Sequence, residues 1–109
     1  MSHIFDDREK QFEAKYKHDE ELRFKVHVRR DKLLGLWAAA ELGLKGAEAE
    51  AYAKSLVNAD LEKLGHGDLV EKILADFRAR KIEMSAHRVR RQMEACLEEA
   101  RRQMMKEVK

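Results

Sequence analysis

Proline is absent from this chain of 109 residues, which contains only one cysteine and five glycines. Few residues therefore interrupt the long runs of side chains that favour helix, and the composition predicts an all-α protein. A single cysteine excludes an intramolecular disulfide, and we expect a reducing, cytoplasmic compartment.

Charge of one sign is also lacking, since 23 Lys and Arg residues face 21 Asp and Glu residues and leave a formal net charge of +2. Such a balance disfavours a strongly basic protein that binds nucleic acid. No segment approaches the roughly 20 consecutive apolar residues that a membrane-spanning helix needs. We therefore expect neither nucleic-acid binding nor direct membrane contact.

The motifs of catalysis and of metal binding are missing as well. Gly65-His66-Gly67 has neither the strand nor the following lysine of a phosphate-binding loop, and we interpret it as a turn. The five histidines do not recur four residues apart on one helix face, so no metal site is expected. Cys96 falls on an apolar stripe and is expected to be a core thiol rather than a nucleophile. The chain is therefore predicted not to be an enzyme and to hold no cofactor or metal.

Apolar residues recur at helical spacing in four segments. We predict one long helix from about residue 6 to Gly43, a second over 47–64, a third over 68–80 and a fourth over 86–105 that is capped by Ser85. Trp37 is expected to anchor the core. Gly35 beside it predicts that another helix or a partner approaches closely. The fold class is therefore a small four-helix bundle, all-α, with a long first helix.

The predicted helices differ in length. At 1.5 Å per residue the first helix would span ~55 Å, whereas the fourth would span ~30 Å. Residues before about Asp19 would then overhang the bundle and have no bundle to pack against. We therefore divide the chain into an N-terminal segment, residues 1–18, and a four-helix domain, residues 19–109.

The overhanging segment is rich in aromatic side chains, because Phe5, Phe12 and Tyr16 all lie within it. One interpretation is a frayed terminus. Another is an amphipathic helix that becomes ordered when these aromatic residues enter the groove of a partner. Composition alone favours the first interpretation, whereas the concentration of aromatic residues favours the second.

Several longer stretches point to a family. The residues are Phe5-Asp6-Asp7-Arg8-Glu9, Phe12-Glu13-Ala14-Lys15, His18-Asp19-Glu20-Glu21, Lys32-Leu33-Leu34-Gly35-Leu36-Trp37-Ala38-Ala39, Ala49-Glu50-Ala51-Tyr52-Ala53-Lys54 and Gly65-His66. Over essentially its whole length the chain resembles the zeta subunit of the F-type ATP synthase of alphaproteobacteria, an ATPase inhibitor. The resemblance implies a four-helix fold and an N-terminal helix that enters a catalytic interface between the α and β subunits, against the central stalk, and stops ATP hydrolysis.

Carried over by position, the resemblance places the inhibitory contacts in the N-terminal segment. Phe5, Phe12 and Tyr16 would be buried in the interface, with polar contacts from Asp7, Arg8, Glu9, Lys10, Glu13 and Lys15. The protein would then be cytoplasmic and peripheral to the inner membrane through the ATP synthase.

Two other functions remain open on the residues alone. One is a regulatory domain that senses nucleotide, with Arg88, Arg90 and Arg91 as the phosphate contacts. The other is an adaptor bundle with a different protein partner. A solvated, salt-bridged helix face is the plainer interpretation of these arginines, since Glu94, Glu98 and Glu99 are interleaved with basic residues further along the same helix.

Overall fold

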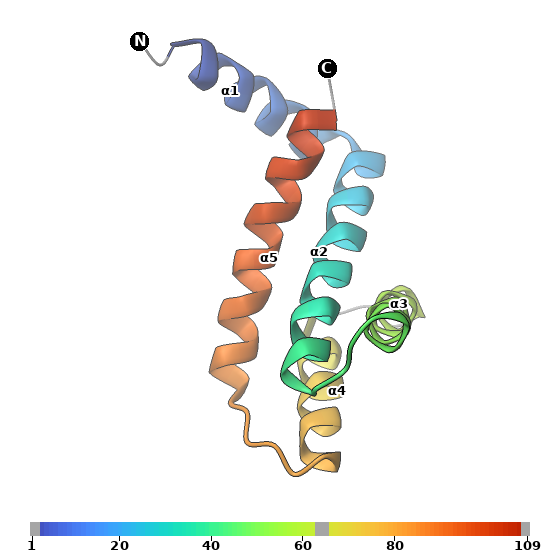
Figure 1. The fold of residues 1–109 in the computed structure, drawn as a ribbon. Helices are drawn as coiled ribbons and strands as arrows, with labels where there is room; N and C mark the ends of the chain where they lie inside the picture. The colour runs from blue at the N-terminus through green and yellow to red at the C-terminus, as the bar shows by residue number, and fades with distance from the viewer. Residues whose placement is uncertain (1–2, 63–65, 108–109) are drawn as a thin grey trace.

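The computed structural model describes residues 3–62 and 66–107, with side chains for 9–62 and 69–107. Within these ranges the chain forms α1 (His3–His18), α2 (Glu20–Glu41), α3 (Ala47–Glu62), α4 (His66–Ala79) and α5 (Ala86–Glu107). Figure 1 shows α2 and α5 side by side and antiparallel, with α3 crossing α2 and α4 at the end of the bundle remote from α1. The predicted all-α bundle is confirmed.

The C-terminus of α2 has the geometry that the sequence predicts. Gly43 adopts a φ of 85°, which a residue with a side chain rarely adopts. Its amide donates to the carbonyl of Ala40 (3.1 Å), and the amide of Leu44 donates to the carbonyl of Ala39 (2.8 Å). These two bonds satisfy carbonyl groups that the helix leaves unpaired, and they turn the chain toward α3.

Ser85 caps α5 as predicted, because its Oγ accepts a hydrogen bond from the amide of Arg88 (3.0 Å). The helix then buries one face, formed by residues that recur at three- and four-residue spacing: Val89, Met93, Cys96, Ala100 and Met104. Cys96 lies on this stripe, as the sequence predicts. This regular stripe lets α5 pack along the length of α2.

The larger core cluster joins α2, α3, α4 and α5. Its most enclosed side chains are Phe77, Leu34, Leu56, Ile73 and Val89. Trp37 is half-buried against this cluster, with its ring centroid 6.3 Å from that of Phe77. Trp37 therefore packs at the edge of the core, rather than inside it as an anchor would.

Gly35 lies where α2 and α3 come closest. A Cβ atom on Gly35 would stand 2.6 Å from the Cα of Ala53 and 3.0 Å from its Cβ. Backbone atoms cannot yield to such a contact as a flexible side chain can. The glycine is therefore required by the close approach of α3, as the sequence predicts.

Two predicted features of the chain path are wrong. The first helix is not continuous, because it divides at Asp19 into α1 and α2. His66 and Gly67 lie in the first turn of α4 rather than in a turn. Gly65, the remaining residue of that predicted turn, lies outside the described residues.

We expect Gly35→Ala to destabilise the bundle although alanine favours helix more than glycine does. Clash with the Ala53 backbone should outweigh the gain of about 1 kcal/mol in helix propensity and lower the free energy of unfolding by about 1–3 kcal/mol. Urea titration followed by circular dichroism measures it. Ala40→Leu, at an exposed position of the same helix, is the control and should change stability by less than ~0.5 kcal/mol. A more stable Gly35→Ala variant would contradict the close approach.

Candidate partner-binding site

The segment expected to bind a partner is a separate helix because the backbone leaves helical geometry at Asp19. This residue has φ −107° and ψ 103°, and its carboxylate accepts a hydrogen bond from the amide of Leu22 (3.1 Å). Asp19 is therefore the N-cap of α2, and Glu20 and Glu21 in the first turn suit the positive end of the helix dipole. Arg23 strengthens the corner by donating to the carbonyl of Lys17 (3.1 Å).

The change of direction brings α1 across the ends of α2 and α5. Figure 1 shows its N-terminal part extending past α5, as expected of an overhang. Its C-terminal part, however, packs on the bundle. Phe12 is only 6% exposed, in a cluster with Leu22, Val26, Ala100 and Met104. The expectation that Phe12 has nothing in its own fold to pack against is wrong, because it assumed one straight helix.

Tyr16 joins the same cluster and is half-buried. Its ring is stacked at 6.1 Å on that of Phe12. The guanidinium of Arg101, on α5, lies over the Tyr16 ring, 5.0 Å from its centroid. Cation–π contacts of this kind contribute about 0.5–1 kcal/mol when partly exposed. Tyr16 is therefore also partly covered by the protein's own bundle.

A salt bridge adds to this attachment, since Arg101 pairs with Glu13 of α1. The same guanidinium reaches Glu98 of its own helix (3.6 Å). A cleft of about 370 Å³ remains between α1 and α5 beside these groups, and it is lined by Glu9, Phe12, Glu13, Glu98, Arg101, Arg102 and Met105. The contact between α1 and the bundle is thus one buried ring with polar groups around it.

The other predicted site residues lie beside the cleft, at exposed positions of α1 or beyond the described side chains. Glu9, Lys10 and Lys15 are exposed, and Glu13 is half-exposed. Phe5, Asp7 and Arg8 belong to α1, but their side chains lie outside the part of the chain that the structure describes. The exposed residues alternate in charge, and they surround the covered aromatic face.

Among the arginines considered as phosphate contacts, Arg88 is engaged within the protein, whereas Arg90 and Arg91 are exposed. Arg88 pairs with Glu41 (2.9 Å) and lies 5.8 Å from the centroid of the Trp37 ring. Arg90, two residues later on the helix, points to a different face. Arg88 is thus engaged at the junction of α2 and α5, and no observation here favours the nucleotide-sensing alternative.

Among the described residues, no three His, Cys, Asp or Glu side chains gather closely enough to hold a metal ion. The same part of the chain has no helix long and apolar enough to cross a bilayer. Cys96 is buried, and burial raises the pKa of its thiol, which disfavours the nucleophilic thiolate.

The sequence contains a signal for the break between α1 and α2. Asp19 precedes two glutamates and an apolar residue, which is the composition of a helix N-terminus. Arg101, by contrast, gave no such signal. Its pairing with Glu13 depends on the path of the chain at Asp19.

We expect Phe12→Ala to detach α1 from the bundle. The lost burial is worth about 1.5–3 kcal/mol, so protection of α1 amides against hydrogen exchange should fall by about tenfold or more. Amides of α3 should change little because they lie in the other core cluster. Lys15→Ala, exposed on the same helix, is the matched control. Unchanged protection of α1 in Phe12→Ala would show that this ring does not hold the helix.

Two comparisons with known proteins find matches that cover most of the chain. Residues 1–103 match the family model described as ATPase inhibitor subunit zeta. A structure solved by solution NMR has a TM-score of 0.70 and 40% sequence identity, and the match covers 80% of this chain and 99% of that one. No curated protein matches the chain. The family match includes all of α1 and most of α5.

Proposed function

Because the chain belongs to the ATPase inhibitor subunit zeta family, we propose that α1 is the segment that inhibits the F-type ATP synthase. Members of this family are non-catalytic regulatory subunits. In the proposal, α1 enters a catalytic interface between the α and β subunits, beside the central stalk, and blocks ATP hydrolysis. The protein is then cytoplasmic and is held at the inner membrane through the synthase.

The observation that carries the proposal is the separation of α1 from the rest of the fold. One extended residue, Asp19, joins it to α2. A small contact holds it to the bundle, formed by the buried ring of Phe12, the half-buried ring of Tyr16 and the ion pair of Glu13 with Arg101. A helix attached in this way can leave the bundle while α2 to α5 keep their own core. That core is complete without α1, since the larger cluster uses no residue before Leu33.

Inhibition of a rotary enzyme needs no catalytic group on the inhibitor. A helix that fits one conformation of a closing interface better than the others shifts the enzyme toward that conformation and stops the cycle there. The absence of a catalytic motif from the sequence is consistent with such a role. The adaptor alternative differs only in the partner, and the family membership favours the ATPase.

Release from the bundle is a required step of this mechanism. Phe12 and Tyr16 are covered in the free protein, so they reach a partner only after α1 leaves α5 and the bond between Glu13 and Arg101 breaks. The fraction of molecules with α1 released then limits the apparent affinity for the ATPase. Phe5, Asp7, Arg8, Glu9, Lys10, Glu13 and Lys15 would complete the contact.

Removal of residues 1–18 should abolish inhibition of ATP hydrolysis by the cognate ATPase head. The full-length protein should inhibit in the same assay. Circular dichroism on the shortened protein checks that the remaining helices fold. Equal inhibition by the two proteins would overturn the assignment to α1.

Arg101→Leu tests whether release of α1 comes before inhibition. Loss of the salt bridge and of the contact with Tyr16 weakens the attachment by about 1 kcal/mol, which predicts half-maximal inhibition at about a fivefold lower concentration. Arg91→Leu, which removes an exposed arginine near the start of α5 and outside the cleft that faces α1, serves as the control. Weaker inhibition by Arg101→Leu would place this face of α5 in the contact with the ATPase and contradict a release step.

A further inference from the structure

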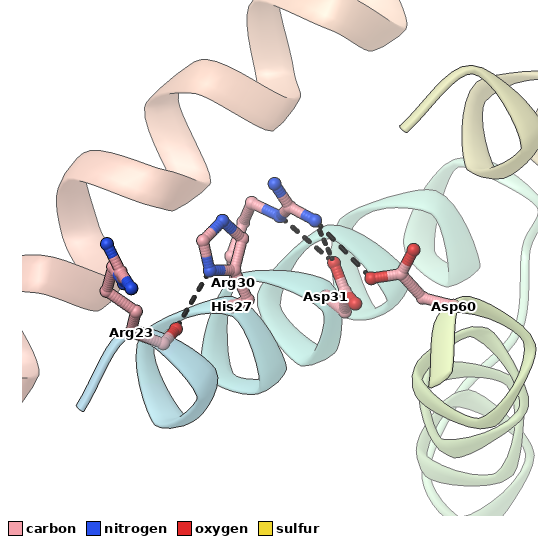
Figure 2. A network of polar contacts seen from close by, with 5 residues as sticks. All are labelled: Arg23, His27, Arg30, Asp31 and Asp60. Atoms are coloured by element: carbon pink, nitrogen blue, oxygen red, sulfur yellow. Dashed lines mark hydrogen bonds and ion pairs between the residues drawn. The ribbon is translucent and has the colours of Figure 1, made fainter. Parts of the chain in front are cut away.

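Three charged side chains meet where the middle of α2 contacts the end of α3. Arg30 and Asp31 on α2 are 2% and 3% exposed, and the Asp60 side chain on α3 is 16% exposed. Among residues with described side chains, Arg30 and Asp31 are the buried charged residues. Figure 2 shows the guanidinium of Arg30 facing the carboxyl groups of both Asp31 and Asp60. This cluster has no role in the proposed contact with the ATPase.

The distances show that Arg30 bonds more closely to Asp31 than to Asp60. Its Nε and Nη2 atoms donate to Oδ1 of Asp31 at 3.0 and 2.8 Å. Nη2 lies 3.5 Å from Oδ2 of Asp60, which is a weaker ion pair. Both carboxyl groups therefore lie beside the same guanidinium nitrogen. Two carboxylate oxygens can share a hydrogen bond only when one group is protonated.

The balance of charges also favours one protonated carboxyl group. One guanidinium cannot neutralise two carboxylates, so with both ionised the cluster would hold one excess negative charge in a largely buried place. Such a charge is costly unless it is neutralised. A single proton on the carboxyl pair removes the excess and supplies the hydrogen that the pair needs.

We propose that Asp31 and Asp60 hold one proton between them, and that loss of this proton weakens the attachment of α3 to α2. The pair is thus a proton-binding site built into the contact of two helices. It is independent of the proposed inhibition of the ATPase, since neither residue belongs to α1.

The environment of Asp31 supports this assignment. Burial, followed by the hydrogen bond with Asp60, raises the pKa of Asp31 from its ordinary value of 3.8 to about 7, against the opposing effect of Arg30. Burial disfavours the charged form, and a second carboxylate close by does the same. The proton should therefore leave near neutral pH.

Few other titratable groups face the pair. From α5, Cys96 lies close enough to Arg30 for the guanidinium to favour its thiolate, although burial still raises the pKa of that thiol. On α2, His27 is one turn before Asp31, and its Nδ1 pairs with the carbonyl of Arg23 at 2.8 Å. Beyond Asp60, a cleft between α3 and α4 is lined by the charged residues Glu62, Glu71, Lys72 and Arg78. The cations of that cleft partly balance its acids.

The direction of the pH effect follows from proton linkage. Between pH 3.8 and about 7 the folded pair keeps its proton, whereas a solvent-exposed Asp31 has lost it. The folded state binds more protons in this window, so the contact weakens as the pH rises through it. Below pH 3.8 the shared proton makes its full contribution to the stability of the contact, and above about pH 7 that contribution is lost.

The full-length protein without any substitution gives the first test. We expect the ¹³C resonance of the Asp31 side-chain carboxyl to titrate with a midpoint between about 6 and 8, as a shared proton requires. A midpoint below about 5 for Asp31 would overturn the proposal.

A second test measures the attachment of α3 directly. After correction for intrinsic exchange rates, the opening equilibrium of α3 amides should rise by about tenfold per pH unit between pH 5 and 7, which is the limit for loss of one proton. Asp31→Asn and Asp60→Asn should each remove this rise, whereas Glu50→Gln, exposed on α3, should retain it. A rise that persists in both Asn variants would show that other groups cause it.

Discussion

The backbone corner at Asp19 decides where the first helix can lie. With helical geometry at this residue, α1 would continue the axis of α2 and leave Phe12 in solvent. The capping bond to Leu22 instead ends one helix and begins another, and α1 then crosses the ends of α2 and α5. Burial of Phe12, the stacking of Tyr16 and the pairing of Arg101 with Glu13 all depend on this change of direction.

Helix α2 is the element that the other parts share. Its first half receives Phe12 through Leu22 and Val26, its middle holds the charged contact with Asp60, and its second half meets α3 at Gly35. The contact with α3 thus has two unlike parts: steric fit at Gly35, which is insensitive to pH, and a carboxyl pair that binds a proton. A partial loosening of α3 at its C-terminal end is therefore possible while the Gly35 contact keeps the helices together.

Local signals in the sequence predicted most of the fold. Gly43, Ser85 and the apolar stripe of α5 act within one helix or one turn, and the structure confirms each of them. Gly35 predicted a close approach because a glycine inside a helix leaves room for another backbone, but only the structure shows that Ala53 is the residue that approaches it. The prediction that α1 continues straight into α2 was wrong, because the N-cap signal at Asp19 is a single residue within a long and continuous helical pattern. The pairs of Arg101 with Glu13 and of Asp31 with Asp60 join distant segments, so no spacing reveals them.

The position of Trp37 has a practical consequence. It is the one tryptophan of the chain, and it packs against Phe77 and Arg88, at the end of the molecule remote from α1. Its fluorescence emission spectrum would therefore report the unfolding of the main core and would not change when the N-terminal helix moves. An extrinsic fluorophore on α1 would be needed to see that movement, and the enclosed position of Cys96 leaves an engineered surface thiol as the preferred attachment point.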